Sequence, residues 1–256
     1  MAGFPPGNKN MPMKIALIGL GKMGKAIERL ALRKSHDIVL KIDLENREEL
    51  TAGNLQRADV AIEFSRPEVA FGNIAACLNA GVPVVSGTTG WLSRLGEAKE
   101  LCHKTGGAFL YASNFSIGVN IFFALSRQLA AMMELQNQYD VAMEEIHHTQ
   151  KLDAPSGTAI TLAEGIMRQL SRKKKWVCVE GEGGNPEPVP GELVITSKRI
   201  DQVPGTHIIR WDSAVDSIEI RHMAHSRKGF AAGALAAAAW LVGKKGCFEM
   251  EDMLEF

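Results

Sequence analysis

The chain has 256 residues, 46% hydrophobic and 23% charged, which is enough for a buried core and one large or two smaller domains. Its 29 basic and 29 acidic residues balance to a formal net charge of zero, so the composition predicts neither a nucleic-acid partner nor an anionic membrane surface. The four cysteines lack CxxC spacing and the chain start lacks a secretory pattern, which predicts a reducing, cytoplasmic location.

The first predicted element is a strand over residues 14–18, followed by a glycine-rich turn and a helix. Glycines permit a tight turn and close approach of the backbone to a pyrophosphate, and a helix N-terminus offers N–H groups to phosphate oxygens. A packing turn without a ligand is the alternative. The dinucleotide contacts predicted here are Gly19, Gly21, Lys22, Met23 and Gly24.

A second strand is predicted over residues 37–43, and it ends on an acid. Asp43 falls near the spacing of roughly 20 residues at which a carboxylate accepts hydrogen bonds from ribose. Leu44 follows it, and no arginine stands directly beside it to meet a 2′-phosphate, which favours NADH. Arg47 and Lys22 leave NADPH open, so Asp43 predicts a bias between cofactors.

Strands alternate with helices in the next part of the chain. The predicted strands cover residues 58–64, 82–86 and 108–112, and a helix covers 68–80. This alternation predicts a parallel, Rossmann-like sheet whose ligands lie beyond the carboxyl ends of its strands. We expect Phe64 and Ser65, and the turn of Gly87, Thr88 and Thr89, to line the crevice reached by the nicotinamide. For the glycine-threonine turn, a plain turn is the alternative.

The segment from Glu145 to Thr158 combines two histidines, a lysine and a predicted helix start. A strand over 139–146 precedes it. Pro155 suits a first helical position, and a helix beginning near Pro155 or Ser156 would present the N–H groups of Gly157 and Thr158 to an anion. Proton-transfer groups beside such a site suit a reaction on a small dicarboxylate.

Neighbouring strand residues point to opposite sides, so His147 and His148 should have different roles. Lys151 is the dependable cation, because an unperturbed lysine is charged at neutral pH. Zinc binding is one alternative, but adjacent histidines lack the i,i+4 spacing of helical zinc motifs and no cysteine is near, so we predict no metal. A structural role, with the Pro-Ser-Gly-Thr stretch as a plain helix cap, is another.

The rest of the chain predicts a second sheet. Short strands over 192–196, 207–211 and 217–222 indicate a mixed or antiparallel sheet, with helices over 117–135 and 156–170 on one face and the other face available for subunit packing. The apolar stretch 230–242 is too short to cross a bilayer, so no membrane partner is expected. Arg227 is either a second anion contact or a solvated charge.

Four motifs resemble the dihydrodipicolinate reductase family, and the likeness runs over nearly the whole chain. They are His147-His148-x-x-Lys151-x-Asp153-Ala-Pro-Ser-Gly157-Thr158, Gly87-Thr-Thr-Gly90, Asn114-Phe-Ser-x-Gly118-Val-Asn120 and His222-Met-Ala-His-Ser-Arg227-Lys-Gly-Phe230. The glycine turn is one residue shorter than the form often seen in the family. The segment 180–190 is also looser than the family's arginine-containing stretch.

The resemblance implies reduction of 4-hydroxy-tetrahydrodipicolinate to tetrahydrodipicolinate with loss of water, using NADH or NADPH, in diaminopimelate and lysine biosynthesis. It makes His147 a proton donor and acceptor, Lys151 a proton donor and charge partner, and His148 a substrate-binding residue. Gly157 and Thr158 would anchor a carboxylate. Further implied dinucleotide contacts are Gly87, Thr88, Thr89, Ala112, Ser113, Asn114 and Phe115. The family also implies a homotetramer.

The predicted organisation is therefore an α/β fold with two domains. A Rossmann-like dinucleotide-binding domain takes 13–113 and 228–256, and an α+β domain with a mixed sheet, for substrate binding and oligomerisation, takes 114–227. One rival is another two-domain NAD(P)-dependent amino- or hydroxy-acid dehydrogenase, which leaves the histidine-lysine stretch unexplained. A non-catalytic nicotinamide sensor is the other, and it requires a partner-binding or DNA-binding module that the sequence does not display.

Overall fold

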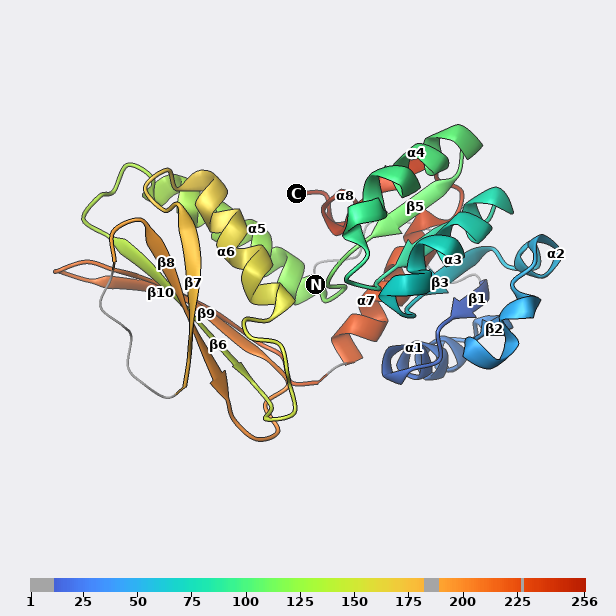
Figure 1. Cartoon of the computed structure of the whole chain (residues 1–256), viewed down its shortest axis with the longest axis horizontal. Coiled ribbons are helices and arrows are strands. Elements are labelled where there is room, and N and C mark those ends of the chain that lie inside the picture. Colours follow the sequence, from blue (N-terminus) through green and yellow to red (C-terminus); the bar gives the residue numbers. More distant parts are fainter. Residues whose placement is uncertain (1–11, 182–188, 227) are drawn as a thin grey trace. The chain divides into compact units, whose positions relative to one another are not determined.

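The computed structural model describes residues 12–181, 189–226 and 228–256, which divide into two compact units (Figure 1). Unit 1 runs up to residue 117 and takes up the chain again from residue 228 to the C-terminus. Unit 2 consists of residues 118–227.

Unit 1 is built on a parallel sheet. Its elements are β1 (Lys14–Ile18), α1 (Lys22–Arg33), β2 (Asp37–Ile42), the 3-10 helix η1 (Leu44–Glu49), α2 (Ala52–Leu55), β3 (Val60–Glu63), α3 (Pro67–Asn79), β4 (Val84–Ser86), the 3-10 helix η2 (Leu92–Arg94), α4 (Leu95–Thr105), β5 (Ala108–Tyr111), α7 (Lys228–Leu241), β11 (Gly246–Phe248) and α8 (Met250–Leu254). The strand order is β11-β5-β4-β3-β1-β2, and every pairing is parallel. Because β2 and β3 flank β1 on opposite sides, the carboxyl ends of β1 and β3 border a topological switch point, where such sheets bind ligands. The predicted Rossmann-like sheet is confirmed.

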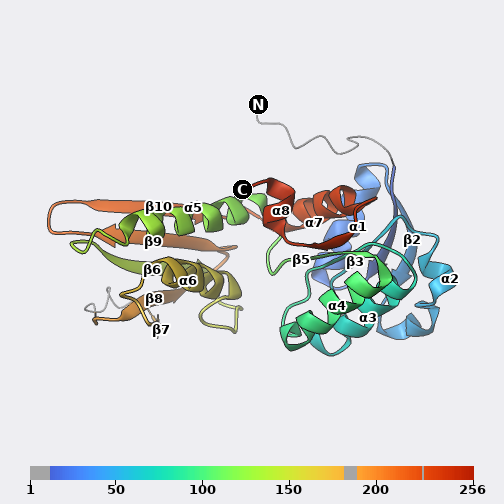
Figure 2. The same ribbon diagram turned by 90° about the horizontal axis from the view of Figure 1, so that it is seen from above.

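Helices cover both faces of this sheet. Figure 2 shows α1 and α7 on one face and α3 and α4 on the other. Successive residues of β3 enter opposite cores: Ile62 packs with Ile27 of α1, and Ala61 packs with Ile74 of α3. Burial on both faces explains why the strands appear in the sequence as continuous apolar runs without polar alternation.

Unit 2 is built on a mixed sheet. Its elements are α5 (Ile117–Met133), which begins at the unit boundary, β6 (Asp140–His147), α6 (Gly157–Gln169), β7 (Lys175–Glu180), β8 (Glu192–Arg199), β9 (Thr206–Asp212) and β10 (Ser217–Met223). The order is β10-β9-β6-β8-β7, antiparallel from β10 to β6 and parallel from β6 to β7. This confirms the predicted mixed sheet.

The sequence analysis missed seven of the described elements, namely η1, α2, η2, α4, β7, β11 and α8. β11 is only three residues long and α8 only five, which is too short for a hydrophobic period to show. β7 follows a run of basic residues, and all its side chains are at least partly exposed, so it lacks the buried alternation of the other strands. Its role as an edge strand is decided by its pairing with β8.

One face of the mixed sheet packs against both helices of unit 2. Val141 and Met143 of β6 share a core with Phe122 of α5 and Leu162 of α6. Because side chains alternate along a strand, Glu145 and His147 continue on the same face as these two apolar residues. The alternation of side chains along β6 therefore places Glu145 and His147 in the buried layer beside the start of α6.

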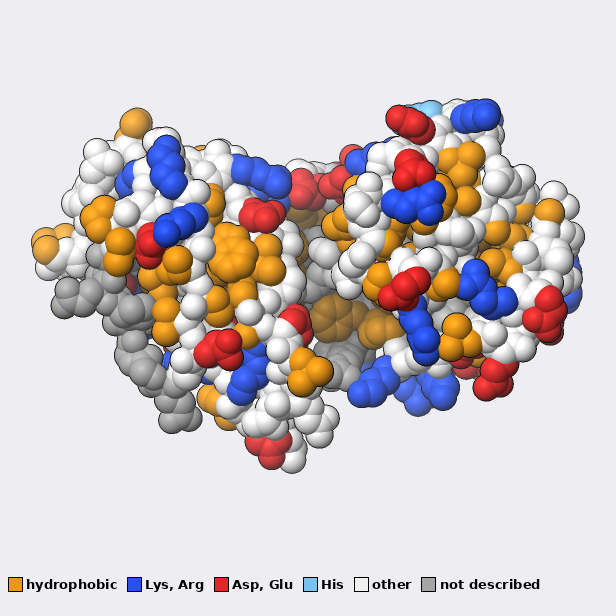
Figure 3. Space-filling view, in the orientation of Figure 1, with side chains coloured by type: hydrophobic (Ala, Val, Ile, Leu, Met, Phe, Trp, Pro, Cys, Tyr) orange, Lys and Arg blue, Asp and Glu red, His pale blue; other side chains and the backbone are white. Residues whose placement is uncertain are grey.

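Among the described residues, no helix combines the length and the apolar character that crossing a membrane would demand. Figure 3 shows basic and acidic side chains interspersed over the face of each unit that it presents.

Candidate functional site

The glycine turn after β1 is shaped by two close approaches. Gly19 has a φ of +92°, and a Cβ there would lie 2.1 Å from the carbonyl oxygen of Phe64. A Cβ at Gly24 would lie 1.9 Å from the carbonyl oxygen of Gly19. At Gly21, which precedes α1, a Cβ would meet nothing within 4 Å, so open space faces the helix start. This backbone cradle fits a pyrophosphate at the N-terminus of α1.

Two other predicted contacts on this turn differ in exposure. Lys22 is exposed in the first turn of α1, whereas Met23 packs its side chain against the core of unit 1. A phosphate contact from Met23 would therefore come from its backbone N–H.

Asp43 directly follows β2 and caps the 3-10 helix η1. Its carboxylate accepts a hydrogen bond of 3.0 Å from the backbone N–H of Leu44, and the side chain of Asn46 accepts one of 2.8 Å from the N–H of Asp43. This capping box holds the acid in an exposed position after the strand. The orientation suits a carboxylate that binds ribose hydroxyls.

The predicted contacts after β4 and β5 are divided between backbone and side chain. Thr88 is buried, and its hydroxyl donates to Glu63 at 2.9 Å, so it meets a ligand only through its backbone. Thr89 is exposed and Gly87 half-buried. After β5, Ala112, Asn114 and Phe115 are buried and Ser113 is exposed. Since β3, β4 and β5 are parallel neighbours, these turns share one edge of the sheet.

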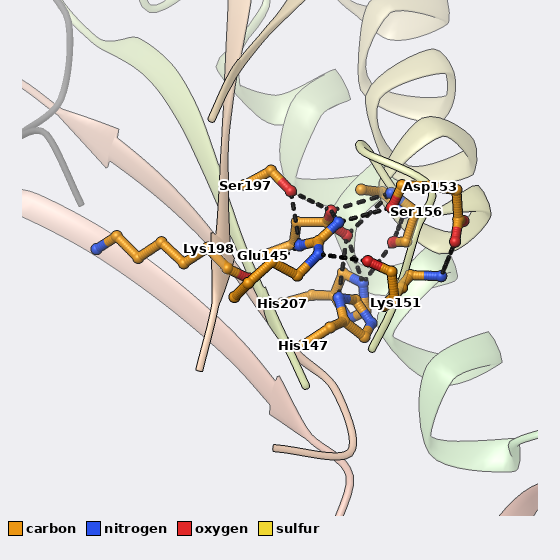
Figure 4. Close-up of polar contacts among 10 residues, drawn as sticks. Glu145, His147, Lys151, Asp153, Ser156, Ser197, Lys198 and His207 are labelled. Atoms are coloured by element: carbon orange, nitrogen blue, oxygen red, sulfur yellow. Dashed lines mark hydrogen bonds and ion pairs between the residues drawn. The ribbon is translucent and has the colours of Figure 1, made fainter. Parts of the chain in front are cut away.

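In unit 2, Glu145 is a fully buried carboxylate that joins three parts of the chain (Figure 4). It accepts a hydrogen bond of 3.0 Å from the backbone N–H of Ser156 at the start of α6, and one of 2.7 Å from the hydroxyl of Ser197 on β8. The guanidinium of Arg199 lies 3.5 Å away. Burial raises the pKa of Glu145, but the hydrogen bonds from Ser156 and Ser197 and the neighbouring His147 bring it below the usual value. The carboxylate is therefore ionised at neutral pH.

His147 lies at the end of β6, beside this carboxylate. Its Nδ1 is 3.4 Å from Oε2 of Glu145, outside good hydrogen-bond geometry, and has no hydrogen-bond partner among the described residues. Burial lowers the pKa of His147 to about 4, although Glu145 acts in the opposite direction. The imidazole is therefore neutral at pH 7 in the ligand-free protein.

A second histidine, His207 on β9, completes the cluster. Its ring centroid lies 5.2 Å from that of His147, and its Nε2 is 3.2 Å from the hydroxyl of Ser156. Burial and the neighbouring His147 lower its pKa to about 3. Two neutral rings thus surround one carboxylate under the N-terminus of α6.

The loop between β6 and α6 is held by Lys151 and Arg199. The ammonium of Lys151 pairs with the carboxylate of Asp153 at 2.7 Å. Arg199 donates 2.6 Å to the carbonyl oxygen of Asp153 and 3.3 Å to that of Lys151. These bonds tie the lysine-bearing loop to the end of β8.

The predicted position of Pro155 in the helix is wrong. α6 begins at Gly157, and Ser156 is its N-cap, whose hydroxyl accepts 3.2 Å from the N–H of Ala159. Pro155 therefore precedes the cap, and Gly157 and Thr158 are the first two helical residues. Their N–H groups lie in the first turn of the helix, where the positive end of the helix dipole favours an anion. His148, half-buried, leads out of β6 into the loop.

Glu145, His147 and His207 could in principle hold a metal ion, since one ligand atom from each lies within 4.8 Å of the others. One acid and two histidines are a donor set that zinc accepts. However, the carboxylate already accepts hydrogen bonds from Ser156 and Ser197 and faces the cationic Arg199. These partners favour a hydrogen-bonded network over a metal site, and the expectation of no metal stays a prediction.

Sequence reasoning missed the parts of this site that come from distant strands. Glu145 stands two residues before His147, so strand periodicity contained a signal for the pair. Ser197, Arg199 and His207 lie far along the chain, and only the pairing of β6 with β8 and β9 brings them near. Arg227 and residues 182–188 of the looser segment lie outside the described residues.

Comparison with known proteins gives two family matches that together cover most of the chain. The model "Dihydrodipicolinate reductase, N-terminus" matches residues 13–115, and "Dihydrodipicolinate reductase, C-terminus" matches 118–254. The chain is 49% identical to a 4-hydroxy-tetrahydrodipicolinate reductase of Christiangramia forsetii, over 94% of this chain and 98% of the relative. It is 33% identical to one of Neisseria gonorrhoeae, over 95% and 98% of the two chains.

A solved structure shares the fold. It is a dipicolinate-bound dihydrodipicolinate reductase from Paenisporosarcina sp. TG-14, with a TM-score of 0.75 and 23% identity. The alignment covers 93% of this chain and 98% of that structure.

The buried histidines predict a loss of stability in mild acid. An unfolded histidine has a pKa of about 6.5, whereas burial lowers those of His147 and His207 to about 4 and about 3. The unfolded chain therefore binds more protons below pH 6.5, and the free energy of unfolding should fall there by at most about 1.4 kcal/mol per pH unit for each ring. Denaturant unfolding between pH 7.5 and 5 measures this slope.

His207→Asn should flatten the pH dependence because it removes one titrating ring. His103→Asn is the matched control, since His103 is exposed on α4 and should leave the slope unchanged. Equal slopes in the two variants would contradict the burial argument.

Proposed function

The chain belongs to the dihydrodipicolinate reductase family, and from this premise we propose how its residues carry the reaction. Its activity is that of a 4-hydroxy-tetrahydrodipicolinate reductase of lysine biosynthesis, with NADH or NADPH as cofactor, as the sequence analysis predicted. The rival dehydrogenase and the non-catalytic sensor are set aside by this membership.

The overall reaction requires one proton to balance the hydride. The substrate and NAD(P)H, with one proton, yield tetrahydrodipicolinate, NAD(P)⁺ and water. The cofactor supplies the hydride when it is bound. The protein must therefore bind a dicarboxylate, orient it and deliver a proton.

We propose residues 13–113 with 228–256, which lie in unit 1, as the dinucleotide-binding domain and residues 114–227, which include all of unit 2, as the substrate-binding and oligomerisation domain. The backbone cradle at Gly19 and Gly24 supports pyrophosphate binding, and the capped carboxylate of Asp43 supports ribose binding. The turns after β4 and β5 would meet the nicotinamide end. The proposed cofactor contacts are Gly19, Gly21, Lys22, Met23, Gly24, Asp43, Gly87, Thr88, Thr89, Ala112, Ser113, Asn114 and Phe115.

In unit 2 we propose that Gly157 and Thr158 anchor one carboxylate through the N-terminus of α6, while His148 binds the substrate. The relative from Paenisporosarcina is described as dipicolinate bound, and a dicarboxylate of this kind suits a helix N-terminus with its positive dipole end. Lys151 adds a charge partner and a proton donor.

His147 takes the role of proton donor and acceptor. It is neutral without ligand, because burial lowers its pKa to about 4. A bound dicarboxylate brings negative charge near the ring and raises its pKa, so that protonation accompanies substrate binding. The observation that carries this proposal is the hydrogen bond that the N–H of Ser156 donates to Glu145: one carboxylate lies against His147 and holds the start of the proposed anion-binding helix.

The experiment that tests the proposed activity follows the loss of nicotinamide absorbance. Purified protein is mixed with freshly generated 4-hydroxy-tetrahydrodipicolinate, with NADH and NADPH in parallel. We expect rapid oxidation that depends on the substrate, faster with NADH because Leu44 follows Asp43 and no arginine adjoins it. A folded protein that binds dinucleotide but oxidises neither cofactor would contradict the activity.

Lys151→Ala should lower turnover by about 100-fold or more, the usual contribution of a positioned proton donor. Binding of NADH should change less than about threefold, because the lysine belongs to unit 2. Steady-state kinetics and a fluorescence titration measure the two effects.

Lys198→Ala is the matched control. Lys198 also pairs with a carboxylate, Glu144 at 2.6 Å, but points away from His147 and His207 in Figure 4. It should keep turnover within about twofold of the parent chain. An equal loss in both variants would refute the role of Lys151.

We propose a homotetramer that forms through the mixed sheet of unit 2. The helices α5 and α6 share one core with one face of the sheet, whereas Met223 of β10 is an exposed apolar side chain on the other face, because it alternates with Ile220, which packs against that core. Sedimentation analysis should give the mass of four chains, and a monomer at micromolar concentration would contradict it.

A cytoplasmic location is the remaining part of the proposal. All four cysteines, Cys77, Cys102, Cys178 and Cys247, are free thiols, as a reducing compartment favours. Cell fractionation tests it, and recovery outside the cytoplasmic fraction would contradict it.

A further inference from the structure

Glu63, the last residue of β3, is a buried acid that the roles above do not use. Its side chain has no exposed surface. One carboxylate oxygen accepts 2.9 Å from the hydroxyl of Thr88 and 3.1 Å from the backbone N–H of Ser65, whose hydroxyl also donates to it. The other oxygen accepts 2.7 Å from the hydroxyl of Ser86. The acid thus joins the ends of β3 and β4.

These contacts fix the direction of the hydroxyl groups. Within the described part of the chain, Glu63 forms no ion pair, so its partners are neutral donors. Burial raises the pKa of Glu63 above its usual value, and the hydrogen bonds from Ser65, Ser86 and Thr88 offset part of that rise. With its hydrogen directed at Glu63, the hydroxyl of Thr88 accepts 2.8 Å from the N–H of Ser65. The two turns are thereby bonded to each other as well as to the acid.

Neighbouring helices and turns hold the same group from outside. Asn73 of α3 donates 3.1 Å to the hydroxyl of Ser65, and the indole N–H of Trp91 donates 2.7 Å to the carbonyl oxygen of Thr88. The glycine turn packs on the backbone of Phe64, whose N–H donates 2.8 Å to the carbonyl oxygen of Ile18 on β1, so this contact does not depend on the side chain of Glu63. The cluster stands at the switch point between β1 and β3.

We propose that Glu63 is a positioning residue for the nicotinamide half of the dinucleotide, because it fixes the turns at Ser65 and Thr88 against each other. It acts without touching the ligand. The adenine half depends instead on the glycine turn and on Asp43, which do not bond to Glu63. This inference rests on the proposed dinucleotide role of unit 1.

The test compares two ligands on the full-length protein. NADH spans the whole predicted site, whereas ADP lacks the nicotinamide riboside. Glu63→Met removes both acceptor oxygens at similar side-chain length. It should raise the Kd for NADH about tenfold or more and change the Kd for ADP less than about twofold, both measured by calorimetry. Glu63→Gln keeps one acceptor oxygen for Ser65 and Thr88, and should restore NADH binding to within about threefold.

The matched control is Ile74→Ala, a buried change on α3 in the same unit. It should lower the Tm while the ratio of the two Kd values stays that of the parent chain. A loss of NADH and ADP affinity in equal proportion by Glu63→Met, or no loss at all, would overturn the proposal. If Glu63→Met does not fold, Thr88→Val decides, because it removes the bridging hydroxyl at constant volume. An unchanged ratio in that variant overturns the proposal as well.

Binding, not turnover, is the readout. A parent chain that binds NADH and ADP but reduces no substrate would count against the proposed function and leave the role of Glu63 intact. A parent chain with normal turnover, together with variants whose ratio of NADH and ADP Kd values is unchanged, would support the proposed function and overturn the role of Glu63.

Discussion

Burying a carboxylate costs several kcal/mol unless its oxygens accept hydrogen bonds, and each unit of this protein buries one completely. Glu63 ends β3 in unit 1, and Glu145 lies near the end of β6 in unit 2. Each is satisfied by serine or threonine hydroxyls on a neighbouring strand or its turn, and by a backbone N–H from the loop that follows its own strand. The need for those donors determines how the loops at both sites are placed.

In unit 2 the need to satisfy a buried carboxylate couples substrate binding to proton transfer, which a reductase of a dicarboxylate has to combine. The carboxylate of Glu145 holds the N-cap Ser156 and lies against His147, so the proposed anion anchor and the proposed proton donor share one support. The strand end is bound from the other side as well, since the N–H of Ile200 donates 2.8 Å to the carbonyl oxygen of His147. A site held at both ends loses little conformational entropy when the substrate binds.

In unit 1 the same constraint works at a parallel sheet. Its central strands are apolar because helices cover both faces, and the buried polar side chains of Glu63 and Ser86 end β3 and β4 at the carboxyl edge. The single acid inside β3 is therefore informative: it stands at the edge where ligands of this architecture bind. The tight packing of Gly19 on Phe64 links the glycine turn to the carboxyl edge of the sheet.

The sequence by itself determined the parts that depend on neighbours along the chain: the glycine turn between β1 and α1, the alternation of strands and helices, and the histidine-lysine segment before α6. Its motifs also carried the family and the reaction. Local sequence patterns did not predict short elements such as β11. They also placed Pro155 at the first position of a helix that begins at Gly157. Only the tertiary structure decided which distant groups meet the two buried acids. Strand register brings Ser197 to Glu145 and Ser86 to Glu63, and a period along one strand contains no information about the register of the next.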